Sequence, residues 1–274
     1  MKILYRDAKS IVFWNNLIAP WGTHSLKFFG ATGQVALLFF ESIVGICTKP
    51  IKWRHVLDQM NKVGVTSFPL VFLTALFTGM VLALQSAYQL KLFAATQYTA
   101  DLVALSVTRE LGPVLTAMVV AGRVGASITA ELGTMKVTEQ IDALSSLAVD
   151  PVRYLVVPRF IAAFFMLPFL TLYADFIGMF GGFLIGTTTL GLSATQYFQS
   201  TFFRALVLKD VMTGLIKSFA FGIIISIVGC WQGFNAEGGA EGVGKATTIS
   251  VVTSLVLIIS SDCLFTALFY FVFG

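Results

Sequence analysis

The sequence predicts an all-α integral membrane protein with an N-terminal interfacial helix, five transmembrane helices and a short cytoplasmic helix between spans two and three. Hydrophobic residues make up 57% of the 274 residues and charged residues only 12%, against roughly 25% charged residues in soluble proteins. Uncharged stretches recur, and the longest exceed the roughly 20 residues that a membrane-crossing helix needs. A net charge of +4, with no basic face interleaved with aromatics, argues against nucleic acid as a partner.

The apolar runs place the spans in order. The first is the clearest, because no charged residue occurs between Lys62 and Lys91. The segment 25–48 is apolar but carries Lys27 and Glu41, which favours an amphipathic interfacial helix over a sixth span. Residues 1–24 precede it as a separate cytoplasmic or interfacial segment. The predicted spans are 63–90, 100–128, 158–187, 211–234 and 248–273.

The distribution of basic residues predicts the orientation. Eight precede the first span, whereas the loop after that span holds Lys91 alone; the eight are Lys2, Arg6, Lys9, Lys27, Lys49, Lys52, Arg54 and Lys62. The positive-inside rule therefore places the N-terminus and the segment 130–157 in the cytoplasm. Arg204 and Lys209 fall on the outer side and are a mild exception.

Span two contains charges at fixed points, namely Arg109, Glu110 and, further along, Arg123. Each such charge costs about 2.5–3.5 kcal/mol on insertion scales, so it is expected to be paired, near a boundary or functional. Pro113 lacks the backbone donor for the carbonyl of Arg109, which predicts a kink beside Glu110. Two interpretations stay open. Glu110 either shapes the polar end of a cavity or pairs with Arg109 or Arg123 to hold the helices.

The segment 131–144, ELGTMKVTEQIDAL, predicts a short helix on the cytoplasmic side. Its apolar positions recur at helical spacing, Thr138 can cap a helix, and Glu139 and Asp142 suit a first turn. Gly133 is expected to mark its start. Such a helix would press one side against the membrane domain and present the other to a soluble partner. A plain connecting helix is the alternative.

Other motifs favour simpler interpretations. Residues 239–245 fit GxxxxGK, but Ala246 stands where a phosphate-binding loop has Ser or Thr, and both flanks are membrane spans. We therefore expect a flexible cytoplasmic turn rather than a nucleotide site. Gly178, Gly182 and Gly186 recur every four residues and predict close helix packing. No residue arrangement typical of a catalytic or metal site emerges.

One long block resembles a known family. RELGPVLTAMVVAGRVGASITAELGTMKVTEQIDAL, followed by VDP, is similar to the signature block of MlaE-type (YrbE) permeases. These permeases are the membrane subunits of ABC transporters that work with MCE-domain proteins. The blocks GMVLALQ (79–85), PRF (158–160) and GGAEGVGKATT (238–248) resemble further family blocks in the same order. The resemblance covers residues 25–274.

The resemblance implies a homodimer of permeases in the bacterial inner membrane, with two cytoplasmic ABC ATPase subunits below and an MCE-protein ring on the outer face. The cargo would be phospholipid or a related lipid, and ATP and magnesium would bind the ATPase rather than this chain. Spans one, two and five would line a lipid cavity with Leu82, Leu90, Phe93, Arg109, Glu110 and Leu111. A coupling helix at about 131–146 would use Glu131, Lys136, Glu139, Asp142 and Leu144.

Two competing functions are weighed against this one. An ion-coupled secondary transporter or channel would use the intramembrane acids Glu110, Asp175 and Asp262. A structural membrane anchor would need none of the charges in span two. An ATPase that co-purifies with the chain would distinguish the first hypothesis from both.

Overall fold

The computed structural model describes residue 26, residues 29–46, residue 48 and residues 52–273. Predictions for residues 1–24, Lys27 and Lys49 lie outside this part of the chain. Every regular element within it is helical. After an N-terminal helix (Phe29–Ile46), the elements are α2 (Trp53–Val63), η1 (Val65–Ser67), α3 (Phe68–Lys91), η2 (Thr96–Tyr98), α4 (Thr99–Ser106), η3 (Val107–Leu111), α5 (Gly112–Val120), η4 (Ala121–Gly125), α6 (Ala126–Val137), α7 (Gln140–Ser146), η5 (Val152–Val156), α8 (Val157–Thr188), α9 (Ala194–Gln199), η6 (Ser200–Ala205), α10 (Leu208–Phe234) and α11 (Gly239–Phe273).

All five predicted spans are present as long apolar helical units, and the all-α membrane fold is confirmed. Each unit covers its predicted span to within one residue and begins before it. A run of apolar residues marks only the lipid-compatible part, whereas the backbone hydrogen bonds continue into amphipathic turns at the ends. The units are Trp53–Lys91, Thr96–Val137, Val152–Thr188, Leu208–Phe234 and Gly239–Val272.

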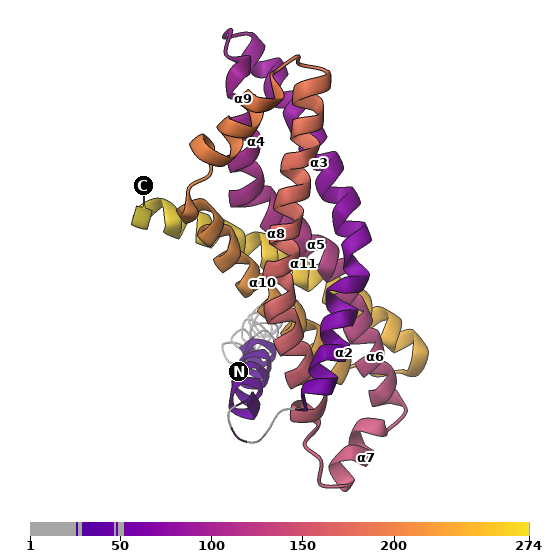
Figure 1. Ribbon diagram of the computed structural model, residues 1–274. Coiled ribbons are helices and arrows are strands. Elements are labelled where there is room, and N and C mark those ends of the chain that lie inside the picture. Colours follow the sequence, from indigo (N-terminus) through magenta and orange to yellow (C-terminus); the bar gives the residue numbers. More distant parts are fainter. Residues whose placement is uncertain (1–25, 27–28, 47, 49–51, 274) are drawn as a thin grey trace, which may run out of the picture.

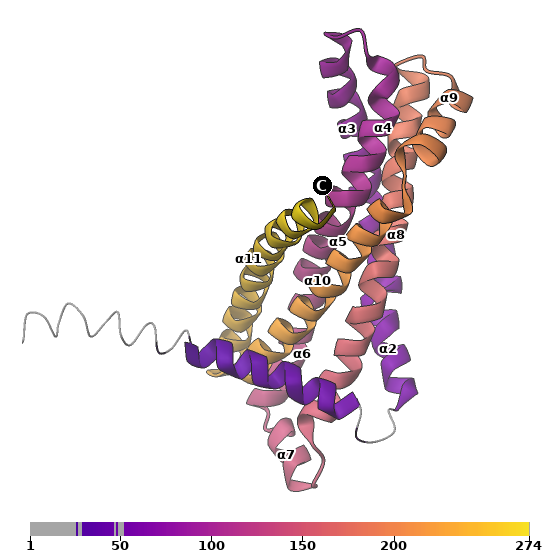
Figure 2. The ribbon, with the colours of Figure 1, turned by 90° about the vertical axis from the view of Figure 1, so that its left-hand side faces the viewer.

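The N-terminal helix, Phe29–Ile46, differs from these units in direction. It is long and apolar enough to cross a membrane, yet it lies crosswise to the bundle, near the end that carries α7 (Figure 2). Leu37 and Phe40 are exposed, whereas Leu38 and Ser42 are buried. This direction and this two-sided character fit the interfacial helix that the sequence favours.

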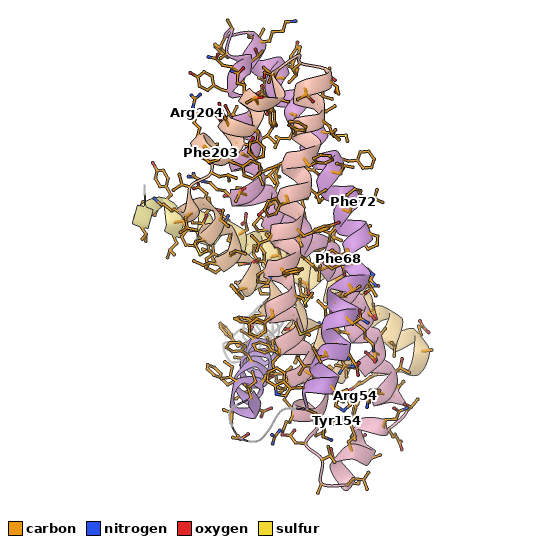
Figure 3. The ribbon with its side chains drawn as sticks, viewed as in Figure 1. Arg54, Phe68, Phe72, Tyr154, Phe203 and Arg204 are labelled. Atoms are coloured by element: carbon orange, nitrogen blue, oxygen red, sulfur yellow. The ribbon has the colours of Figure 1, made fainter. Side chains whose placement is uncertain are left out.

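The core forms where α8 packs between α3 and α10 (Figures 1 and 3). Leu167 and Leu170 of α8 are fully buried there with Phe221 and Ile225 of α10. The glycine stripe on α8 serves this packing, as predicted. A β-carbon on Gly79 of α3 would collide with the backbone carbonyl of Gly178, and the ring of Tyr197 covers Gly182 and Gly186. The close contacts lie within the chain.

The boundaries of the predicted coupling helix are wrong. The helix of span two continues through α6 to Val137, so Glu131 and Lys136 belong to the end of the span. Gly133 lies buried inside α6, and Thr138 ends that helix instead of starting the next one. The separate helix is α7, Gln140–Ser146, and Glu139 precedes it with a left-handed φ of 60°. This left-handed residue is the physical break between the two helices.

The flexible turn expected at 238–248 is also wrong. Within 238–248 only Gly238 and Gly239 have left-handed φ, at 87° and 69°. The helix α11 begins at Gly239, so Lys245 lies in its second turn and Ala246 is buried. A phosphate-binding loop needs free backbone amides, whereas those beyond the first helical turn are already bonded. The GxxxxGK sequence is therefore helical and has the wrong shape for phosphate.

Candidate functional site

The charged dipeptide of span two lies on a helix irregularity. Arg109 and Glu110 fall in η3, a π-helical turn, and Gly112-Pro113 then begin α5. Because Pro113 has no N–H, the carbonyl of Arg109 loses its usual α-helical donor. The Nζ of Lys217, on α10, donates to that carbonyl at 3.2 Å. At the position of the predicted kink the structure has a π-helical turn, and a side chain from another span satisfies the acceptor that it leaves.

Lys217 is the centre of an ion cluster. Its side chain is 2% exposed, although it carries a charge in the middle of an apolar helix. Its Nζ lies 2.7 Å from Oε2 of Glu110 and 2.9 Å from Oδ1 of Asp262. It also donates to Oγ1 of Thr266 at 2.8 Å, and that hydroxyl donates to Glu110 at 3.1 Å. Removing one member would leave a buried charge unbalanced.

Arg109 makes a separate pair beside this cluster. Its Nε donates to Oδ1 of Asp210 at 2.7 Å, and the other carboxylate oxygen accepts from the backbone N–H of Val207 at 3.3 Å. Asp210 is 3% exposed, whereas Arg109 is 53% exposed. The guanidinium is therefore anchored at one edge and open to a ligand along the other.

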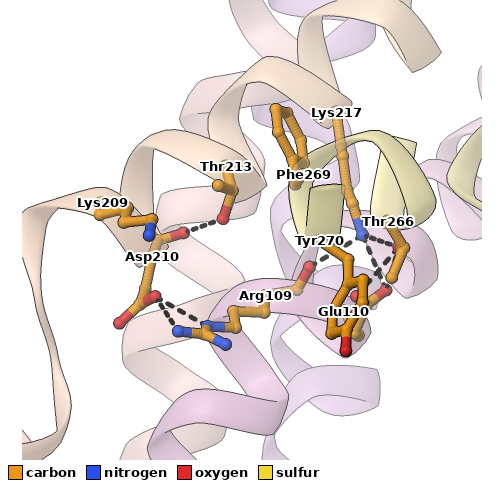
Figure 4. A pocket seen from close by; sticks show the side chains of 9 residues that line it. All are labelled: Arg109, Glu110, Lys209, Asp210, Thr213, Lys217, Thr266, Phe269 and Tyr270. Atoms are coloured by element: carbon orange, nitrogen blue, oxygen red, sulfur yellow. Dashed lines mark hydrogen bonds and ion pairs between the residues drawn. The ribbon is translucent and has the colours of Figure 1, made fainter. Parts of the chain in front are cut away.

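A cavity of ≈ 210 Å³ adjoins both pairs (Figure 4). Charged side chains from span two and from the start of α10 form one part of its wall, and α11 contributes the aromatic rings of Phe269 and Tyr270. Such a wall suits a molecule with a charged end and an apolar body. The lining residues are Arg109, Glu110, Lys209, Asp210, Thr213, Lys217, Thr266, Phe269 and Tyr270.

The other residues predicted to line a lipid cavity lie elsewhere. Leu111 borders a narrow pocket of ≈ 10 Å³ between span two, α3 and α8. Leu82 packs beside a small cluster that includes Val107. Leu90 lies in the last turn of α3, and Phe93 lies beyond that helix with 80% of its surface exposed. Spans two, four and five line the ≈ 210 Å³ cavity, whereas the predicted lipid cavity was assigned to spans one, two and five.

The three intramembrane acids fall into two groups. Glu110 and Asp262 converge on Lys217, although they are far apart in the sequence. Asp175 lies apart from them, 5% exposed and close against Gly112, which has no side chain to exclude it. The sequence interpretation that pairs Glu110 with Arg109 or Arg123 is not what the structure has. Lys217 is the partner of Glu110.

The residues predicted for coupling divide between inner and outer positions. Glu131 pairs with Lys62 at 3.1 Å and with Arg159 at 2.9 Å, so it holds α6 to α2 and α8. Leu144 packs against the main core. Glu139 is exposed, and Asp142, 61% exposed, pairs with Lys136 at 3.2 Å. Among the five, Glu139 and Asp142 are the most available to a partner.

Sequence reasoning missed Lys217 and Asp210. A signal for Lys217 was present, because it is the one charged residue between 211 and 234. A lone lysine in an apolar helix demands a partner, and Glu110 and Asp262 were the available carboxylates. Asp210 was harder to recognise, since its position just before the span suits an exposed helix start equally well.

The long apolar helical units and the charged cavity among them define a multi-span membrane permease. The chain belongs to the MlaE permease family, and residues 56–268 match the family described as Permease MlaE. It is 48% identical to a probable ABC transporter permease protein of Rickettsia typhi, over 91% of this chain and 96% of that protein. It is 44% identical to a probable ABC transporter permease protein of Synechocystis, over 89% and 90%. It is 35% identical to the intermembrane phospholipid transport system permease protein MlaE of Haemophilus influenzae, over 93% and 98%.

Proposed function

We propose that the chain is the permease subunit of an ABC transporter that moves phospholipid between the inner membrane and an MCE-domain partner. Family membership and the similarity to the Haemophilus influenzae phospholipid permease support the transporter class. The observation that supports phospholipid as the transported molecule is the wall of the ≈ 210 Å³ cavity, which places cations beside aromatic rings. Arg109 can bind a lipid phosphate through its open edge. Phe269 and Tyr270 suit acyl chains.

The proposed assembly is a homodimer that closes the cavity from the open side. In the most apolar 18-residue stretch of α11, only 6% of the residues are buried within the chain. The corresponding share for the helical unit that contains α8 is 72%. The separation of α11 from much of the bundle is visible in Figure 2. A second copy packed along α11 would bring two such cavities to one axis. Leu82 and Leu111 would extend that space with apolar side chains, and Leu90 and Phe93 would lie toward its outer rim.

The ATPase is proposed to dock at α7. This helix projects from one end of the bundle (Figure 1). Asp142 on the helix and Glu139 immediately before it are both exposed. A pair of ATPase subunits would hold ATP and magnesium, and their closure would press on α7. Because α6 leads directly into α7 and is held to α8 through Glu131, that force would reach span two. The MCE-domain ring would sit at the opposite end, near α9.

We propose that the α7 end faces the cytoplasm of a bacterium, together with the N-terminus. The excess of basic residues before the first span supports this orientation. Arg204, the outer-side exception, pairs with Asp101 at 3.5 Å and lies over the ring of Tyr98 at 4.8 Å. Because Asp101 balances its charge, Arg204 is a weaker argument against a cytoplasmic α7 end.

Mass spectrometry of lipids bound to the purified complex tests the proposal. We expect phospholipid at defined stoichiometry, an ATPase that co-purifies, and loss of bound lipid when Arg109 is replaced by Ala. Arg54→Ala, an exposed change outside the cavity, is the control. A complex without an ATPase, or with lipid content unaffected by Arg109→Ala, would contradict it.

Ion coupling is less favoured, because Lys217 already neutralises part of the charge of Glu110 and Asp262.

A further inference from the structure

A second and larger cavity lies between α2 and the end of span two. Its volume is ≈ 930 Å³, within the range of about 300–1,000 Å³ that is typical of small-molecule sites. We call it the α2–α6 cavity. Its wall includes Lys62 and Thr66 from the first helical unit and Arg123 and Ser127 from the second. It shares no lining residue with the ≈ 210 Å³ cavity around Arg109 and Lys217.

Among the residues of this wall, Arg123 is the cation that lacks a counterion within the described part of the chain. It lies inside the predicted span 100–128, about 7.5 Å along the helix axis before the end of that span. Its Nη1 donates to Oγ of Ser67 at 2.8 Å, but no carboxylate among the described residues lies within ion-pair distance of it. Arg109, Arg159 and Lys217 each have a carboxylate partner. An unbalanced cation at membrane depth is costly, so its anion is expected to come from outside the chain.

The rim of the α2–α6 cavity adds further positive charge. Glu131 pairs with both Lys62 and Arg159, so one carboxylate balances two cations. Arg159 is buried and lies outside the cavity wall, so the wall itself carries two cations, Lys62 and Arg123, and one carboxylate, Glu131, which Lys62 and Arg159 already neutralise. Glu131 lies about 12 Å along the helix axis from Arg123, and Val63, Val124 and Ile128 contribute apolar wall between the two levels. The cavity therefore fits an anion that also carries an apolar part.

We infer that the α2–α6 cavity binds an anionic phospholipid through its phosphate, from the membrane leaflet at the α7 end of the bundle. The remaining N–H groups of the Arg123 guanidinium donate to the phosphate oxygens, because a planar guanidinium can bind a phosphate through two parallel hydrogen bonds. Ser127 offers a hydroxyl to the glycerol region, whereas the Thr66 hydroxyl already donates to the carbonyl of Lys62 at 2.6 Å. The apolar wall holds the start of the acyl chains. The inference goes beyond the proposed transport function and depends on membrane insertion alone.

Photolabelling of the full-length protein tests this inference. The protein is reconstituted in nanodiscs that contain phosphatidylglycerol with a diazirine near the glycerol end of an acyl chain, and adducts are mapped by mass spectrometry. We expect adducts in the segments 59–66 and 123–134. Arg123→Gln should reduce them at least fivefold, while Arg123→Lys should retain about half. Arg54→Gln, an exposed change on the same helix as Lys62, is the matched control and should leave them unchanged.

A second variant protects the test against misfolding at Arg123. Ser127 lies one turn from Arg123 on the same helix face, so Ser127→Trp fills the cavity but keeps the cation, and it should reduce the adducts equally. Adducts in the segment 262–272 serve as the reference for a folded protein. Wild-type labelling of both Arg123→Gln and Ser127→Trp would overturn the inference. Competition by millimolar inorganic phosphate would assign a soluble anion instead, and labelling of monomers but not dimers would show that a second copy fills the cavity.

Discussion

The ammonium nitrogen of Lys217 lies 3.2 Å from the carbonyl oxygen of Arg109, the acceptor that Pro113 leaves without its helical donor. The same nitrogen lies 2.7 Å from the carboxylate of Glu110. The irregularity in span two and the ion pair are therefore one structural unit. Lys217 satisfies the backbone and balances the neighbouring carboxylate at the same time, and this joins span two to span four beside the cavity.

Replacing Lys217 with Met should destabilise the protein strongly. The change keeps most of the side-chain volume but leaves Glu110, Asp262 and the Arg109 carbonyl without the ammonium group. Breaking a fully buried ion pair by removing one partner costs about 3–5 kcal/mol. Because the side chains of Glu110 and Asp262 are 41% and 19% exposed, we expect a loss at or below the lower end of that range. We expect a lower midpoint of thermal unfolding and less monodisperse protein in size-exclusion chromatography. Lys245→Met, at an exposed position of α11, is the control and should behave like the wild type.

Neutralising the acids should partly reverse this loss. A variant that combines Lys217→Met with Glu110→Gln and Asp262→Asn removes the unbalanced charges, so its unfolding midpoint should lie above that of Lys217→Met alone. Equal midpoints for the single and the triple variant would show that the ion cluster is not what Lys217 stabilises.

Glu110 should distinguish a cavity function from a purely structural one. Glu110→Gln keeps the size of the side chain, and Lys217 retains Asp262 as a partner, so the complex should assemble with nearly normal lipid content. Glu110→Lys places a second ammonium beside Lys217 and reverses the charge at the cavity wall. We expect it to assemble and hydrolyse ATP but to lose most bound phospholipid and transport. Failure of both variants to assemble would make Glu110 a structural member of the ion cluster only.

The spans could be predicted from the sequence because lipid imposes a one-dimensional rule. An uncharged run such as 63–90 must be helical and must cross the membrane, whatever its neighbours are. The ends were less predictable. Glu139 holds the left-handed φ that separates α6 from α7, but glutamate gives no sign of this, since glycine and asparagine are the usual residues there. The start of α11 was missed because its glycines resemble a loop.

The candidate site was only half predictable. Arg109 and Glu110 attract attention as charges in an apolar run, and Pro113 predicts that the carbonyl of Arg109, within span two, lacks its helical donor. Which cation pairs with Glu110 depends on how α10 crosses span two. Contacts such as the close approach of Gly214 to the carbonyl of Thr108 set this crossing. Side-chain contacts between helices distant in the sequence are three-dimensional facts that residue spacing does not contain.

Reversing the charges on α7 should detach the ATPase. The double change Glu139→Lys and Asp142→Lys alters the exposed side of the helix and leaves the inward contact of Leu144 with the core intact. We expect the permease to insert and remain dimeric while co-purification of the ATPase falls severalfold. A single change should have little effect, because one exposed pair contributes only about 0–1 kcal/mol. Normal co-purification of the double variant would place the docking surface elsewhere.

Lys136→Ala is the control for that experiment. Asp142 pairs with Lys136 within the chain, so part of any effect could come from loss of this internal contact. Lys136→Ala removes the pair without reversing the charge of α7, and it should retain the ATPase. If Lys136→Ala alone releases the ATPase, the internal pair positions α7 and the exposed carboxylates are not the contact.

A methyl group at Gly79 should push α3 away from α8, against which it packs in the core. A β-carbon there would overlap the backbone carbonyl of Gly178, which cannot rotate away as a side chain could. Overpacking of this kind costs about 1–3 kcal/mol, so Gly79→Ala should lower the midpoint of thermal unfolding of the purified protein. Gly244→Ala is the matched control, because Gly244 lies within α11 and nothing lies within 4 Å of its β-carbon position. That change should be neutral or stabilising by about 0.5–1 kcal/mol, since alanine favours a helix over glycine. If Gly79→Ala matches Gly244→Ala in stability, then α3 and α8 do not pack as closely as the glycine stripe on α8 indicates.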